Sequence, residues 1–124
     1  MTLQPTVFIV DDDKAVRDAV HLLCEVHGLQ VESYASAQAF LDDYIPTRRG
    51  CLVLDLCMPE MDGLELQAHL AARQIELPII FITAHSSNGE AKRALKAGAL
   101  DVLEKPFQPH VLIERIHTAF KSIK

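Results

Sequence analysis

The sequence predicts an α/β fold with a doubly wound, five-stranded parallel sheet and five helices. Two observations lead to this prediction. Short apolar runs rich in β-branched residues recur along the chain, as in parallel strands that are buried on both faces. Helical segments alternate with these runs, which indicates right-handed crossovers and helices on both sides of the sheet. We expect the strand order 2-1-3-4-5.

The first strand and the first helix have the clearest patterns. A central strand is predicted over Thr6–Val10, which is apolar apart from its first residue. A helix is predicted over Lys14–His27, with Asp13 as its cap and Gly28 as its end. One stripe of this helix is apolar at helical spacing and is expected to face the sheet: Val16, Ala19, Val20, Leu23 and Val26.

The second and third units follow the same pattern with less regular sequences. An edge strand is predicted over Val31–Tyr34, where apolar and polar residues alternate, and Ser36 can cap a helix that runs to Tyr44. The run Cys51–Leu54 is apolar throughout and predicts another central strand. The segment Gly63–Ala72 alternates like a strand, but it lacks β-branched residues and must connect two parallel strands, so we predict a helix.

Two more strands and two helices complete the prediction. A central strand is expected over Pro78–Thr83 and a short edge strand over Asp101–Glu104. Between them a helix is predicted over Glu90–Ala97, with Gly98 as its stop. The last helix is predicted from an apolar stripe near the C-terminus: Leu112, Ile116, Ala119, Phe120 and Ile123.

Length and composition indicate one globular domain over residues 1–124, since 49% of the residues are apolar and 23% are charged. The net charge of −5 would repel nucleic acid phosphates and anionic membranes, so we expect no direct nucleic acid binding by this domain and no membrane association. The apolar runs are too short to span a bilayer, and we expect a cytoplasmic protein. Three cysteines without a C-x-x-C pair are expected to be reduced thiols.

Polar residues follow the predicted strands where the strands end. Asp11 and Asp12 follow the first strand, and Asp55 follows the third. Thr83 and Lys105 stand at the ends of the fourth and fifth strands. Because the carboxyl ends of parallel strands share one edge of the sheet, these five side chains should meet in one crevice.

Three carboxylates in one crevice repel one another unless a cation binds among them. The donors on offer are oxygens, so the cation should be Mg²⁺ or Mn²⁺. Asp55 can then attack a phosphoryl group whose charge the metal and Lys105 would neutralise, while Thr83 donates its hydroxyl and the small Ala84 leaves the backbone accessible. Asp13 is expected to cap the first helix, and Glu60 and Asp62 to be solvated loop charges.

Four motifs, in this order, resemble those of the receiver (CheY-like) domains of two-component response regulators: VDDDKAVR, LDLCMPEMDG, FITAH and LEKPF. The resemblance covers essentially the whole chain. It implies that Asp55 is the phosphoacceptor, that Asp11 and Asp12 bind the metal together with Asp55, and that Cys57 adds its backbone carbonyl. It further implies switch and phosphate-binding roles for Thr83, Ala84 and Lys105, and a sensor histidine kinase as partner. The domain would be a phosphotransfer substrate that catalyses its own phosphorylation and dephosphorylation, not an enzyme.

The resemblance also bears on several finer points. Cys57 and His85 occupy positions that influence phosphoryl lifetime in the family. Val102 stands where receivers usually carry an aromatic ring, so the signal is expected to pass through the loop from Ala84 to Gly89. The bond from Lys105 to Pro106 is expected to be cis, as receivers commonly have it. A phosphorylation-dependent homodimer is expected on a face that contains Ala91, Ala94, Leu95, Asp101, Val111 and Arg115.

The FixJ-type regulators, in which a transcription domain usually follows the receiver, are resembled more specifically by five segments: YASAQAFL, GCLVLDL, GLELQ, FITAH and LEKPF. We expect regulation of transcription through an output domain that is absent from this chain. Two other classes stay open. A phosphohydrolase of the haloacid dehalogenase type also uses an aspartyl nucleophile, but it needs Asp-x-Asp, and Cys57 stands at the second acid. A flavin or nucleotide binder would place glycines or hydroxyls where this chain has three aspartates.

Overall fold

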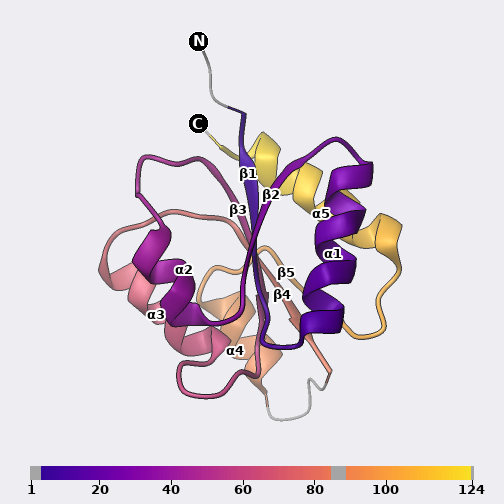
Figure 1. Cartoon of the computed structure of the whole chain (residues 1–124). Coiled ribbons are helices and arrows are strands. Elements are labelled where there is room, and N and C mark those ends of the chain that lie inside the picture. The colour runs from indigo at the N-terminus through magenta and orange to yellow at the C-terminus, as the bar shows by residue number, and fades with distance from the viewer. Residues whose placement is uncertain (1–3, 85–88, 124) are drawn as a thin grey trace.

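A computed structural model describes residues 4–84 and 89–123 of the chain (Figure 1). In the described residues, five strands form one parallel sheet in the order β2-β1-β3-β4-β5, which confirms the predicted topology. The strands are β1 Thr6–Val10, β2 Gln30–Tyr34, β3 Gly50–Asp55, β4 Ile79–Thr83 and β5 Asp101–Glu104. The helices are α1 Lys14–Val26, α2 Ala37–Asp43, α3 Gly63–Ala72, α4 Glu90–Lys96 and α5 Pro109–Lys121.

The helices cover the two faces of the sheet unequally, with α1 and α5 on one face and α2, α3 and α4 on the other (Figure 1). Each central strand supplies both layers, because successive side chains point to opposite faces. In β1, Val7 and Ile9 pack with α1 and α5, whereas Phe8 and Val10 pack with the helices on the other side. Every residue of β1, β3 and β4 is buried, as their continuous apolar runs predicted.

The buried face of α1 matches the predicted apolar stripe in part: Val20 is buried, and Val16 and Leu23 pack against the same core cluster. Val20 and Cys24 are its buried residues, four positions apart on one face. Val26 was expected to face the sheet but is 72% exposed, and Ala19 is also exposed. The apolar stripe is wider than the contact that the helix makes, so packing against β1 and β2 selects the side that contains Cys24.

The ambiguous segment Gly63–Ala72 is a helix, α3, as predicted. Its Leu66 and Leu70 are buried against β3 and β4, at the i, i+4 spacing of a helical face. Asp62, expected to be a solvated charge, is instead the N-cap. Its side chain accepts a hydrogen bond from the Glu65 amide at 2.8 Å, and Glu65 accepts one from the Asp62 amide at 3.1 Å. This reciprocal capping box fixes where α3 begins.

Candidate functional site

The carboxyl ends of the strands bring the predicted site residues to one edge of the sheet. Val10 of β1 lies opposite Leu54 of β3, so the residues that follow them, Asp11 and Asp55, are neighbours. Thr83 ends β4, and Lys105 follows β5 directly. The Lys105 amide donates a hydrogen bond to the Thr83 carbonyl at 2.7 Å, which extends the β4–β5 pairing up to the site.

Three carboxylates form the centre of this site. Asp11, Asp12 and Asp55 each offer an oxygen, and these three oxygens all lie within 4.8 Å of one another. Asp11 is completely buried and Asp55 is 5% exposed, whereas Asp12 faces solvent. A cluster of carboxylate oxygens with one open side suits a hard divalent cation such as Mg²⁺, which keeps several of its waters.

Lys105 supplies a positive charge beside two of these carboxylates. Its Nζ lies 3.3 Å from Oδ2 of Asp11 and 3.7 Å from Oδ2 of Asp55, and its side chain is 20% exposed. The remaining oxygens are also bound, because the Asp13 amide donates to Oδ1 of Asp11 at 2.9 Å and the Cys57 amide donates to Oδ1 of Asp55 at 3.2 Å. These contacts fix the directions of both carboxylates.

Burial raises the pKa of Asp55 to about 7, and the neighbouring Asp11 carboxylate adds to the shift. The Cys57 amide and the Lys105 ammonium oppose it without cancelling it. The ionised form of Asp55 is therefore disfavoured when no cation is bound. A divalent cation in the cluster would favour the ionised form and so prepare the carboxylate to act as a nucleophile.

Other residues with predicted roles are found as follows. Asp13 caps α1, since its side chain accepts hydrogen bonds from the amides of Ala15 at 2.9 Å and Val16 at 3.4 Å. The side chain of Thr83 is buried, whereas Ala84 and Cys57 are exposed at the edge of the site. His85 lies outside the described residues. The Lys105–Pro106 peptide bond is cis, which confirms that expectation.

The predicted dimer surface is only partly a surface. Ala94 is the buried residue of α4 and belongs to the core, so it is not available on the surface. Leu95 is 46% exposed. Asp101 and Arg115 form an ion pair at 2.6 Å that joins β5 to α5, and both are partly exposed. Val102, in the place of an aromatic ring, is partly buried against the α2–α4 side of the core.

Two contributors to the site had no assigned role in the sequence. Arg17 donates a hydrogen bond from Nη1 to the Asp11 carbonyl at 2.8 Å. Gly63 begins α3 directly over β3, where an added Cβ would lie 2.5 Å from the Asp55 carbonyl oxygen. In the sequence, the roles of these two residues were indicated only by their positions: the arginine ends the first acidic motif, and the glycine follows Asp62.

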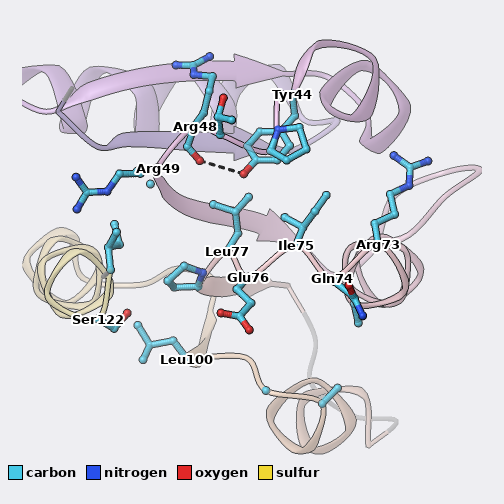
Figure 2. Close-up of a pocket in the computed structure, with 18 residues that line it drawn as sticks. Tyr44, Arg48, Arg49, Arg73, Gln74, Ile75, Glu76, Leu77, Leu100 and Ser122 are labelled. Carbon is cyan, nitrogen blue, oxygen red and sulfur yellow. Dashed lines mark hydrogen bonds between the residues drawn. The ribbon is translucent and has the colours of Figure 1, made fainter. Parts of the chain in front are cut away.

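A surface pocket lies at the end of the sheet opposite the acidic site, near the amino ends of the strands (Figure 2). Tyr44, Arg48, Arg73, Leu77 and Ser122 are among the residues that line it, and the Tyr44 hydroxyl donates to the Arg48 carbonyl at 3.1 Å. None of the described residues that line it was predicted to belong to the functional site.

Together, the fold and the carboxylate cluster with its lysine define a phosphoacceptor domain of the signalling class. The model of the response regulator receiver domain family matches residues 7–117, and the chain belongs to that family. It is 45% identical over 118 residues to the response regulator protein TmoT of Ectopseudomonas mendocina and 44% identical over 118 residues to the transcriptional regulatory protein FixJ of Rhizobium meliloti (strain 1021). Each alignment covers 95% of this chain but only 54% and 58% of the relative. The chain therefore spans little more than half the length of these relatives.

Solved structures agree with this assignment. The FixJ-N crystal structure superposes with a TM-score of 0.91 at 41% identity, covering 99% of this chain and 98% of the other. The structure of the response regulator StyR gives a TM-score of 0.91 at 44% identity, covering 96% of this chain and 60% of the other. Nothing in these comparisons supports the haloacid dehalogenase alternative. No helix in the described ranges is long and apolar enough to cross a membrane.

Proposed function

We propose that Asp55 accepts a phosphoryl group from the phosphohistidine of a sensor histidine kinase. The observation that carries this proposal is the position of Asp55, a buried carboxylate flanked by two further acids and by Lys105. An oxygen of Asp55 would form the new bond to phosphorus as the bond from phosphorus to the kinase imidazole nitrogen breaks. Membership of the receiver family supports both the reaction and the class of partner.

The donor set fits a divalent cation of the Mg²⁺ or Mn²⁺ type. Asp11, Asp12 and Asp55 would hold it through carboxylate oxygens, and Cys57 would add its backbone carbonyl. When bound, such an ion neutralises charge on the phosphoryl oxygens. We place the cation here because three acids beside a single lysine leave the cluster with an excess of negative charge.

The other residues of the site orient and neutralise the transferring group. Lys105 lies within reach of Asp55 and would bind and neutralise a phosphoryl oxygen. Thr83 would donate its hydroxyl to another oxygen, and the exposed Ala84 leaves room beside it. The same groups would support transfer from a small phosphodonor without a kinase and later attack by water, which is why we describe these steps as self-catalysed. Cys57 and His85 would tune the second step.

The response to phosphorylation is proposed to be a homodimer formed through α4, β5 and α5. Leu95 supplies exposed apolar area on this face, and the Asp101–Arg115 pair supplies charge. Relatives named as transcriptional regulators extend well beyond the length that this chain matches, which supports control of transcription through an output domain. From family membership we place the protein in the cytoplasm, and from the net charge of −5 we expect no direct nucleic acid binding by this domain.

The proposal is tested by incubation with Mg²⁺ and acetyl phosphate, followed by intact mass measurement. Wild type should gain the mass of one phosphoryl group, and Asp55→Asn should gain none. Asp42→Asn, which removes an exposed carboxylate on α2, serves as the matched control and should behave as wild type. An equal gain in Asp55→Asn would show that another residue accepts the group.

A further inference from the structure

Arg17 makes two hydrogen bonds to the acidic loop that precedes α1. Its side-chain Nη1 donates to the carbonyl of Asp11 at 2.8 Å, and its backbone amide donates to the carbonyl of Asp13 at 2.9 Å. The two carbonyls lie on either side of Asp12. The hydrogen bond of the amide is the first main-chain hydrogen bond of α1, so the side chain of Arg17 restrains the Asp11 end of the short turn on which Asp12 stands.

Asp12 has little else to hold it. Its side chain faces solvent, and among the described residues its carboxylate has no hydrogen-bond or ion-pair partner. Asp11, by contrast, is buried, and its carboxylate is bound by Lys105 and by the Asp13 amide. The direction of the Asp12 carboxylate therefore depends on the conformation of its own backbone, which Arg17 restrains.

We propose that Arg17 is a positioning residue that holds Asp12 toward the cation site. The inference rests on the cation site proposed above and goes beyond it, because Arg17 contacts neither the cation nor the phosphoryl group in this role. A hydrogen bond to a main-chain carbonyl holds the loop before the cation arrives. Less conformational freedom is then lost when the cation binds.

The charge of Arg17 acts in the opposite direction from its hydrogen bond. A guanidinium beside the acidic cluster repels a divalent cation, so removing the charge alone should tighten cation binding. Removing the restraint on Asp12 should weaken it. The sign of the change in affinity therefore separates positioning from electrostatics.

The experiment measures binding of Mn²⁺ to the unphosphorylated protein from the electron paramagnetic resonance signal of the free ion. Arg17→Met should weaken binding on the order of tenfold, as expected when a group that orients a metal ligand is lost. Lys14→Met is the matched control, because Lys14 is an exposed cation of the same helix that pairs with Asp18. It should bind Mn²⁺ as tightly as wild type or slightly more tightly. If the Arg17→Met protein bound Mn²⁺ as tightly as the Lys14→Met protein, the proposal would be overturned.

A second variant covers the possibility that Arg17→Met does not fold, which thermal unfolding without metal would reveal. Arg17→Lys keeps the charge, but its shorter side chain does not reach the position of Nη1. Electrostatics predicts unchanged affinity for this variant, whereas positioning predicts weaker binding, so affinity equal to that of wild type would overturn the proposal. A wild type that binds no Mn²⁺ would overturn the cation site as well. Failure of phosphorylation alone would leave this measurement unaffected.

Discussion

Asp55 is a residue whose chemistry is set by its neighbours more than by its own side chain. Burial and the Asp11 carboxylate both oppose its ionisation, and Lys105 only partly compensates. The fold therefore keeps a carboxylate with a pKa of about 7 at the tip of a central strand. A carboxylate with this pKa is only partly ionised at neutral pH, and a divalent cation bound beside it would increase the ionised fraction.

The raised pKa predicts how stability depends on pH in the absence of divalent cations. The ordinary value of 3.8 applies to unfolded Asp55 and about 7 to the folded protein, so between them the folded state holds a proton that the unfolded chain releases. Asp55 therefore makes stability fall as pH rises through this window and then level off above it. Asp55→Asn should remove this contribution and gain on the order of 2 kcal/mol relative to wild type between about pH 5 and 7.5. Urea unfolding with a chelator measures the difference, and a difference that does not change with pH would contradict the cause given.

At the scale of elements, the site depends on how closely α3 approaches the end of β3. The Gly63 amide donates to the Leu56 carbonyl at 3.1 Å, and the capping box begins the helix one residue earlier. No side chain separates the first turn of α3 from the backbone of Asp55. The helix therefore helps to fix the strand end from which the candidate nucleophile projects.

This contact predicts a cost for Gly63→Ala. The new Cβ would lie 2.5 Å from the Asp55 carbonyl oxygen and 2.9 Å from Cε1 of Phe81, so α3 or the end of β3 must shift. Overpacking of this kind costs about 1–3 kcal/mol, more than the gain in helix propensity over glycine. Urea denaturation should show the loss, whereas Ala68→Ser, at an exposed position of the same helix, should change stability little. Unchanged stability of Gly63→Ala would mean that α3 is not held against β3.

The central strands were predictable because they are buried on both faces, so nearly every residue of each run is apolar. Once those runs are parallel, Asp11, Asp55 and Thr83 must meet at one edge, so the site followed from the topology. The limits of the buried face of α1 did not follow, since its apolar stripe is wider than the contact and tertiary packing places Cys24, not Ala19 or Val26, in the core. Arg17 and Gly63 were missed because a contact with a main-chain carbonyl depends on the final turn and on the final packing distance.

At the scale of the whole molecule, the cation site proposed at the three acids would link cation binding to folding. The unfolded chain does not hold Asp11, Asp12 and Asp55 together, so Mg²⁺ should raise the melting temperature as its concentration passes its dissociation constant. Asp12→Ala should lose most of that gain. Asp18→Ala removes an exposed acid of α1 outside the cluster and should keep it. Thermal unfolding with and without Mg²⁺ makes the comparison, and an Asp12→Ala protein stabilised as much as wild type would contradict it.

Dimerisation is the second prediction at this scale. Treatment with beryllofluoride, a mimic of the phosphoryl group, should double the mass seen by light scattering. Leu95→Glu should prevent this by placing a charge on the exposed face of α4. Leu22→Glu is the control, because Leu22 is 61% exposed on α1, which covers the other face of the sheet. A wild-type mass that does not change after saturating treatment would end the dimer proposal.

The complete burial of β1, β3 and β4 has a consequence for the durability of the site. Hydrogen exchange is slowest for amides that open only when the whole protein unfolds, and fully buried central strands belong to that class. Asp11, Asp55 and Thr83 are attached to these three strands. These three residues should therefore keep their relative positions through the local fluctuations that loosen edge strands and helix ends, and should separate only when the whole protein unfolds.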